Sequence, residues 1–277
     1  MGTRPVTIGA VRIGGDALGI LAGPCAIESA DLVLRAAEKL RATCDERGLP
    51  FVFKSSYKKA NRSSMDSYTG PGLEAGLAAL ARVRREIDVP VITDVHEVSE
   101  VAAVAEVVDC LQIPAFLSRQ TDLLLACAKS GLPVNVKKGQ FLAPDDMRQV
   151  VEKLERGGAA GILLTERGTS FGHHDLVVDF RGLVVMRELG WPVVHDVTHS
   201  LQHPGGGVTG GDRRFAEPLA LAAVAAGVDA LFFETHPDPE RALSDAATQL
   251  PLGSVPALLD RVARVRDAVA GRVGTRA

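Results

Sequence analysis

The chain has 277 residues, of which 46% are hydrophobic, and its formal net charge is −3. This length and apolar content are sufficient for one large domain with a sizeable core, and we expect a single domain over residues 1–277. The slightly acidic charge argues against a general nucleic-acid or membrane-surface binder, and no apolar run approaches the ~20 residues of a membrane span. Four widely spaced cysteines without a C-x-x-C pair predict a reducing, cytoplasmic location: Cys25, Cys44, Cys110 and Cys127.

The first predicted elements are strands. Residues 6–13 alternate apolar and polar side chains around a glycine, which predicts a short N-terminal hairpin at about 5–14. Short segments rich in Val, Ile, Leu and Phe follow, without strict alternation, as is typical of parallel strands covered on both faces. They lie at about 18–23, 50–54, 89–94, 108–113, 132–137, 160–165, 192–197 and 228–233.

Helical patterns separate these strands. In the first, Val33, Leu40 and Cys44 belong to one apolar face, with Ser29 as the expected N-cap and Gly48 as the stop. Eight strand–helix alternations predict a closed (β/α)8 TIM barrel. An open doubly wound sheet is the alternative, but no G-x-G-x-x-G follows the first strand. The other helices are expected around 73–83 and at 98–107, 122–130, 145–156, 180–189, 214–226 and 255–269.

Polar residues follow every predicted strand. In a (β/α)8 barrel the carboxyl ends of all strands meet at one rim, where active sites form. Eight polar strand ends converging on one rim therefore predict an enzyme. These ends are residues 23–29, 54, 93–97, 112–114, 135–140, 165–168, 195–199 and 234–237.

Cations are concentrated at the rim. The stretch 54–64 carries four cations and no acid, and two further strand ends add more. Such charges repel one another in a low-dielectric mouth, and a phosphorylated, carboxylated substrate would relieve that repulsion. The alternatives are a solvated basic loop, or structural pairing with Asp94, Glu97 and Glu166. The predicted anion-binding cations are Lys54, Lys59, Arg62, Lys137 and Arg167.

Four other residues lie at or after strands one, seven and eight, which are neighbours in a closed barrel: Cys25, His199, Glu234 and Asp245. A thiolate, an imidazole and two carboxylates suit one divalent metal ion, but this mixture does not choose between Zn, Fe, Mn, Co and Cd. The alternative is that Cys25 is a small buried residue and His199 a hydrogen-bonded rim histidine. Spacing alone leaves both interpretations open.

The glycine-rich residues 204–211 are interpreted as a lid that is too flexible for regular structure, with a plain loop as the alternative. A P-loop is disfavoured because no Lys-Ser/Thr follows. We expect Tyr68, His173 and His174 to be packing or surface residues, and Trp191 to be structural at the opposite end of the barrel.

The rim motifs resemble those of 3-deoxy-D-manno-octulosonate 8-phosphate synthases. They include Gly-Pro-Cys-Ala-Ile-Glu-Ser at 23–29, Lys-Ala-Asn-Arg-Ser-Ser at 59–64, Asn-Val-Lys-Lys-Gly-Gln at 135–140 and Asp-Val-Thr-His-Ser-Leu-Gln at 196–202. The resemblance covers about residues 15 to 270 and is carried further by residues 94–97, 112–117, 165–168, 234–237, 243–245 and 249–252. Two departures are a slightly short segment 203–213 and the pair His173-His174, where the family often has an aromatic residue or Asn.

The resemblance implies a (β/α)8 transferase that condenses phosphoenolpyruvate with D-arabinose 5-phosphate and water, releasing phosphate. It implies that the product serves lipopolysaccharide, another glycan or a secondary metabolite, and that the enzyme is a homotetramer. By resemblance, phosphoenolpyruvate is held by Lys54, Lys59, Gln112, Lys137 and Arg167, and the sugar phosphate by Asn61, Arg62 and Ser63.

The metal-dependent class of the family has Cys where the independent class has Asn, so Cys25 implies the metal-dependent class. The remaining ligands would be His199, Glu234 and Asp245. Candidate proton carriers are His199, Asp245 and Asp94, and the other expected catalytic residues are Lys54, Lys59, Asn61 and Lys137.

Two alternatives remain. The sister family, 3-deoxy-D-arabino-heptulosonate 7-phosphate synthase, uses erythrose 4-phosphate and usually has Lys-Pro-Arg-Thr where this chain has Lys-Ala-Asn-Arg-Ser-Ser at 59–64. This difference favours the five-carbon sugar. The second alternative is a non-catalytic phosphosugar-binding barrel, which the full set of cations and metal ligands disfavours.

Overall fold

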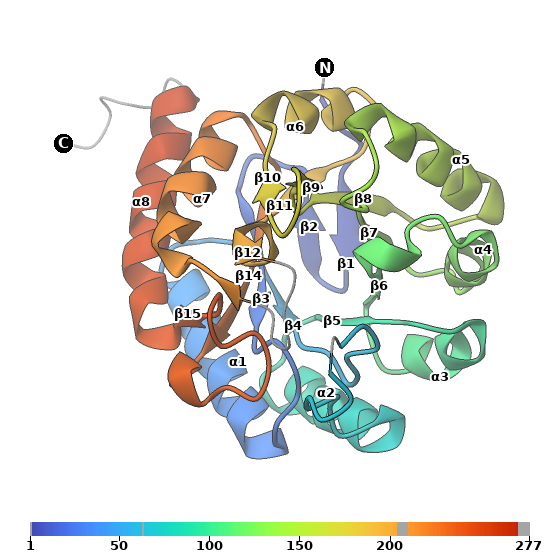
Figure 1. Cartoon of the computed structure of the whole chain (residues 1–277), viewed down its shortest axis with the longest axis vertical. Coiled ribbons are helices and arrows are strands. Elements are labelled where there is room, and N and C mark those ends of the chain that lie inside the picture. Colours follow the sequence, from blue (N-terminus) through green and yellow to red (C-terminus); the bar gives the residue numbers. More distant parts are fainter. Residues whose placement is uncertain (1, 63, 204–209, 271–277) are drawn as a thin grey trace.

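The computed structural model describes residues 2–62, 64–203 and 210–270. In this part of the chain, eight parallel strands form a closed barrel, because β14 pairs with both β11 and β3. Figure 1 looks into this barrel and shows the helices around its outside. The predicted TIM barrel is confirmed, and the open doubly wound sheet is wrong. In hydrogen-bonded order the strands are β3 (Gly19–Gly23), β4 (Phe51–Lys54), β5 (Val91–Asp94), β6 (Cys110–Ile113), β7 (Val134–Lys137), β8 (Ile162–Glu166), β11 (Val193–Asp196) and β14 (Ala230–His236).

The helices follow the predicted pattern. Ser29 caps α1, since its side-chain oxygen accepts from Leu32 N at 3.2 Å, and Gly48 takes a positive φ of 61° just after the helix. The helix predicted at 98–107 is shorter than expected: a 3-10 turn, η1 (Val98–Glu100), precedes a five-residue helix. The helices are α1 (Ala30–Asp45), α2 (Leu73–Glu86), α3 (Val101–Ala105), α4 (Thr121–Lys129), α5 (Met147–Gly157), α6 (Phe180–Arg187), α7 (Ala216–Ala225) and α8 (Val255–Val269).

The predicted N-terminal hairpin closes one end of the barrel. It consists of β1 (Val6–Ile8) and β2 (Val11–Ile13), and Val6, Ile8 and Ile13 are buried. It packs where the strands begin: a Cβ on Gly19, the first residue of β3, would lie 2.3 Å from Ile13 Cδ1. With this end filled, the opposite end, where the strands finish, is left to form the site.

Short strands add to the rim. Two antiparallel hairpins are β9 (Thr169–Ser170) with β10 (Leu176–Val177), and β12 (Gln202–His203) with β13 (Gly210–Gly211), while β15 (Leu250–Pro251) extends β14 in parallel. The prediction that residues 204–211 have no regular structure is therefore wrong for Gly210 and Gly211, and residues 204–209 lie outside the described part. No helix among the described residues has the length and apolar character needed to cross a membrane.

Candidate active site

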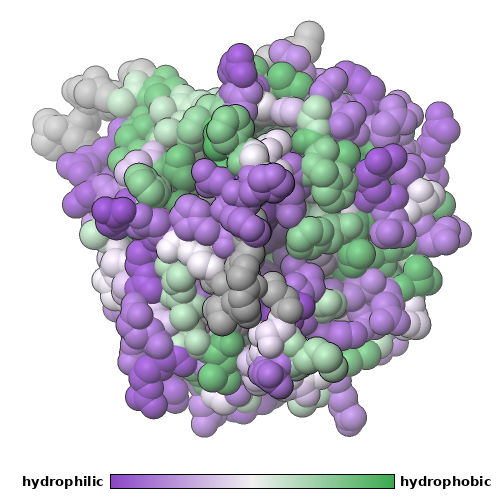
Figure 2. Space-filling model, viewed as in Figure 1, coloured by the Kyte–Doolittle hydropathy of each residue, from purple (hydrophilic) through white to green (hydrophobic). Residues whose placement is uncertain are grey.

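A cavity of about 370 Å³ opens at the carboxyl ends of the barrel strands. Figure 2, drawn from the same side as Figure 1, shows a hollow near the centre of this face. Its lining includes every predicted substrate-binding residue except Ser63, which lies outside the described residues. These are Lys54, Lys59, Asn61, Arg62, Gln112, Lys137 and Arg167, joined in the lining by Asp94, His96, Gln140, His199, Gln202 and Asp245.

Glu234 of β14 is a buried anion that contacts two of the lysines lining this cavity. It is fully buried, and its Oε1 lies 3.1 Å from Lys54 Nζ and 3.4 Å from Lys59 Nζ. Burial by itself raises the pKa of this carboxyl, but the charges of His199, Lys59 and Lys54 outweigh burial and lower the pKa well below its usual value. Its second oxygen, Oε2, is buried and has no hydrogen-bond partner among the described residues.

Asp94 is held by a layer of polar side chains inside the barrel. Ser56 Oγ donates to its Oδ2 at 2.7 Å, and Gln112 Nε2 donates to its Oδ1. Gln112 is fixed in turn by Asn135 Nδ2, which donates to its Oε1 at 3.0 Å. Burial opposes the ionised carboxylate, but Lys54 and Lys59 lower the pKa of Asp94 nonetheless. Asp94 is therefore a fixed negative charge.

Asp196 was not singled out by sequence reasoning, yet it organises the other side of the mouth. Its Oδ2 lies 2.6 Å from Lys137 Nζ and 2.8 Å from His199 Nδ1. Lys137 Nζ lies 3.3 Å from the same Nδ1, so a carboxylate and an ammonium group both face this nitrogen, while Nε2 lies toward Glu234 and Asp245. Lys137 Nζ also lies 3.8 Å from the ring centre of Phe232. The Asp-x-x-His spacing at the end of the seventh strand was the available signal.

Three of the four predicted metal ligands form a cluster, and the fourth, His199, lies beside two of them. Ligand atoms of Cys25, Glu234 and Asp245 all lie within 4.8 Å of one another. His199 Nε2 is 3.6 Å from Glu234 Oε1 and 3.7 Å from Asp245 Oδ2. Burial, followed by the charges of Asp245 and Glu234, raises the pKa of the Cys25 thiol well above its ordinary value, so a thiolate here needs a strong cationic partner. The donor types, their closeness and the unpartnered Oε2 of Glu234 fit one divalent cation.

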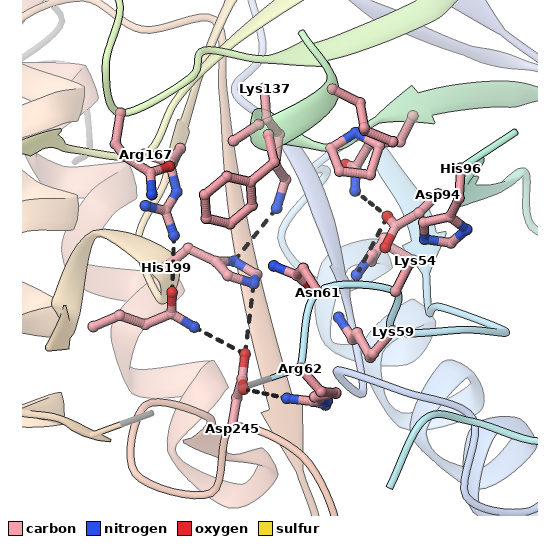
Figure 3. A pocket seen from close by; sticks show the side chains of 18 residues that line it. Lys54, Lys59, Asn61, Arg62, Asp94, His96, Lys137, Arg167, His199 and Asp245 are labelled. Atoms are coloured by element: carbon pink, nitrogen blue, oxygen red, sulfur yellow. Dashed lines mark hydrogen bonds and ion pairs between the residues drawn. The ribbon is translucent and has the colours of Figure 1, made fainter. Parts of the chain in front are cut away.

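Asp245 is held in an unusual backbone conformation, with φ of +48°. Arg62 Nη1 donates to its Oδ1 at 3.1 Å, and Gln202 Nε2 donates to its Oδ2 at 2.9 Å. Figure 3 shows the side chain of Asp245 next to those of His199 and Arg62. The neighbouring Ser244 contacts Cys25 Sγ at 2.9 Å through its hydroxyl.

The alternative that acids neutralise the cations structurally holds only in part. Glu97 lies beside Lys58 at 3.9 Å and Glu166 beside Lys138 at 3.6 Å, so neither is paired with the predicted anion-binding set. Among the described residues around the cavity, five such cations face four carboxylates. The carboxylates are Asp94, Asp196, Glu234 and Asp245.

Two further residues refine the rim. His96 lines the cavity, although it was not among the predicted site residues. Its backbone N–H donates to Glu100 Oε2 at 3.0 Å, and the same oxygen accepts from the hydroxyl of the buried Tyr57 at 2.8 Å.

His195, in contrast, was counted among the polar rim residues, and this is wrong. It is fully buried and faces Phe180 of α6, with the ring centres 6.2 Å apart, because neighbouring strand residues point to opposite faces.

Known proteins resemble this chain over nearly its whole length. The profile described as the DAHP synthetase I family matches residues 4–270. A protein of Cyanothece sp. named 2-dehydro-3-deoxyphosphooctonate aldolase is 56% identical over 258 residues, 92% of this chain and 94% of its own length. Proteins with the same name from Trichlorobacter lovleyi and Acidithiobacillus ferrooxidans are 53% identical over 270 residues (96% of this chain, 99% of theirs) and 58% over 242 (87% and 86%). The chain therefore belongs to the DAHP synthetase I family and, within it, to the group of 2-dehydro-3-deoxyphosphooctonate aldolases, also called 3-deoxy-D-manno-octulosonate 8-phosphate synthases.

Proposed function

We propose that this chain condenses phosphoenolpyruvate with D-arabinose 5-phosphate and water to give 3-deoxy-D-manno-octulosonate 8-phosphate and phosphate. The observation that carries the proposal is one cavity whose lining combines a cluster of lysines and arginines with a thiol, imidazole and carboxylate set beside it. The names of relatives that are 52–58% identical support the same reaction. We also propose that the chain acts as a single barrel domain.

The cations divide between two anionic substrates. Phosphoenolpyruvate is assigned to the deep part of the cavity, where the cations are buried: Lys54, Lys59, Lys137 and Arg167, with Gln112 beside them. The sugar phosphate is assigned to the outer loop after β4, where Asn61 and Arg62 line the cavity. Ser63, the third residue assigned to the sugar phosphate, lies outside the described residues. Fixed cations hold the two anions together against their mutual repulsion and position the reacting carbons.

We propose one divalent metal ion on Cys25, His199, Glu234 and Asp245, as in the metal-dependent class. Support comes from the closeness of these donors and from the unpartnered Glu234 Oε2. Asp196 lies beside Nδ1 of His199, as a carboxylate does for many metal-bound histidines, and Nε2 lies beside the other proposed ligands Glu234 and Asp245. The donor set is compatible with Zn, Fe, Mn, Co or Cd. When bound, such an ion supplies Lewis acidity that orients an aldehyde oxygen or activates water.

In the reaction, carbon 3 of the enol phosphate attacks the aldehyde carbon of the sugar, and positive charge develops at carbon 2. Water then adds at carbon 2, and the resulting hemiketal phosphate releases phosphate. The lysines and Arg167 neutralise the carboxylate and phosphate throughout. Of the candidate proton carriers, Asp94 is disfavoured because its lowered pKa keeps it ionised, so its role is to orient Lys54 and Gln112. His199 and Asp245 remain the candidates for moving a proton.

The alternative substrate is erythrose 4-phosphate, the sugar that the sister family uses. Asn61 favours arabinose 5-phosphate, because it lines the cavity beside Arg62 at the segment where the sister family has Pro. Phosphate release is therefore to be measured with phosphoenolpyruvate and each aldose, with and without a chelator. We expect phosphate release with arabinose 5-phosphate but not with erythrose 4-phosphate, and we expect the chelator to abolish it. Turnover only with erythrose 4-phosphate would reverse the assignment, and no phosphate release with either sugar would support a binding protein.

Assembly and location are further parts of the proposal. A homotetramer agrees with the family and with the exposed apolar side chains Phe116, Phe141 and Phe171 on the rim loops. A cytoplasmic location agrees with the four cysteines, all of which are buried and unpaired. The product would feed lipopolysaccharide or another glycan.

A further inference from the structure

The side-chain amide of Gln202 lies between a cation and an anion of the cavity. Its Oε1 accepts from Arg167 Nη2 at 2.8 Å, and its Nε2 donates to Asp245 Oδ2 at 2.9 Å. Arg167 and Asp245 are labelled on the two sides of this bridge in Figure 3. A guanidinium only donates and a carboxylate only accepts, so the two partners allow a single orientation of the amide.

The amide acts as a neutral spacer. A direct ion pair between Arg167 and Asp245 would withdraw both groups from ligands. With Gln202 between them, the guanidinium of Arg167 has no other hydrogen bond or ion pair among the described residues, although it lines the cavity. Each oxygen of Asp245 has two lone pairs, so its bonds to Gln202 and Arg62 leave acceptor capacity on both oxygens.

The backbone around Gln202 is fastened to the loop that carries Asp245. Gln202 pairs with Gly211, and a Cβ on Gly211 would lie 2.2 Å from Thr248 Cγ2, so the hairpin packs directly on that loop. Just after the hairpin, Arg213 donates to the carbonyl of Ala246 at 2.5 Å. The bridge is therefore rigidly placed, and it helps to hold Asp245 in its strained backbone conformation.

We propose that Gln202 is a positioning residue that couples the metal site to the phosphoenolpyruvate site, which rests on the function proposed above. A metal ion bound to Asp245 fixes the position of this carboxylate. Gln202, which is hydrogen-bonded to the carboxylate, then holds the guanidinium of Arg167 in the orientation that contacts phosphoenolpyruvate. Thermodynamic linkage makes the effect reciprocal: the ion tightens phosphoenolpyruvate binding by the same factor as phosphoenolpyruvate tightens ion binding.

The test compares Gln202→Met, which keeps the length and loses both hydrogen bonds, with the wild type. Zn²⁺ affinity is measured by competition with a chromophoric chelator, with and without phosphoenolpyruvate, and phosphoenolpyruvate binding by calorimetry on metal-free and Zn²⁺-loaded protein. We expect Zn²⁺ affinity to fall by about 10-fold or more, as for other residues that orient metal ligands. We also expect the coupling factor, several-fold in the wild type, to approach one. Gln149→Met, on the exposed face of α5, is the matched control and should change neither quantity.

A second variant separates the two bonds. Gln202→Glu keeps an acceptor for Arg167 but pairs with it as an anion, so phosphoenolpyruvate affinity should fall even in metal-free protein. Circular dichroism of the metal-free proteins shows which of the two variants is folded, and the folded variant is compared with the wild type. If a folded variant keeps the Zn²⁺ affinity and the coupling factor of the wild type, the proposed role of Gln202 is wrong. The proposed function of the protein is not affected by that result. Failure of the wild type to bind Zn²⁺ and phosphoenolpyruvate would overturn the proposed function, and the coupling with it.

Discussion

His195 is expected to make the fold sensitive to acid. It is fully buried, and neither ring nitrogen has a hydrogen-bond partner among the described residues. Burial lowers the pKa of its imidazole to about 4, whereas an unfolded chain has a histidine pKa of about 6.5. Below pH 6.5 the unfolded state therefore binds a proton that the folded state refuses. The stability that His195 contributes is complete above pH 6.5 and is lost as the pH falls toward 4.

The magnitude follows from these two values. The free energy of unfolding should fall by about 2 kcal/mol between pH 7 and pH 5 because of this one group, and by about 3 kcal/mol in total below pH 4. In His195→Leu, which has a similar volume and no titratable group, this part of the pH dependence should be absent. Urea unfolding followed by circular dichroism at pH 7, 6 and 5 measures the difference.

The control is His173→Leu, because His173 is also a histidine but is exposed rather than buried. Parallel pH profiles for the wild type and His195→Leu would show that the buried imidazole does not resist protonation, and the reasoning would be wrong. Since His195 faces α6 rather than the cavity, phosphate release by His195→Leu at pH 7 should stay near the wild-type rate.

Three other predictions concern the site and its support. Arg167→Met should raise the Michaelis constant for phosphoenolpyruvate by about 10- to 100-fold, because one charge-assisted hydrogen bond contributes about 1.5–3 kcal/mol; the exposed Arg148→Met is the control, and an unchanged constant would refute the assignment. Cys25→Ser should weaken Zn²⁺ binding by about 10-fold or more in chelator competition, and metal add-back should not restore phosphate release; wild-type affinity would remove Cys25 from the ligand set. Tyr57→Phe loses the 2.8 Å bond to Glu100 and should lower the free energy of unfolding in urea by about 1 kcal/mol, whereas equal stability would mean that this bond contributes nothing.

The architecture was accessible from sequence because it depends on repeating local patterns. Short apolar segments alternate with amphipathic helices, and each strand ends in polar residues. A closed parallel barrel places all such ends on one rim, so the topology itself brings Lys54, Gln112, Lys137 and Arg167 to one cavity. The cap at Ser29 was equally local, since it depends on residues within one helical turn.

Only the tertiary structure decided which groups pair. Lys54 meets Glu234, 180 positions away, and Asp196 lies between Lys137 and His199, because barrel closure and strand register bring these side chains to one level. Register also decides which way each side chain points. Of two consecutive residues of β11, Asp196 faces the mouth of the barrel and His195 faces α6. Sequence spacing carries neither the partners across the barrel nor the face on which a strand residue lies. The charges of the site were therefore predictable, but their hydrogen-bonded connections were not.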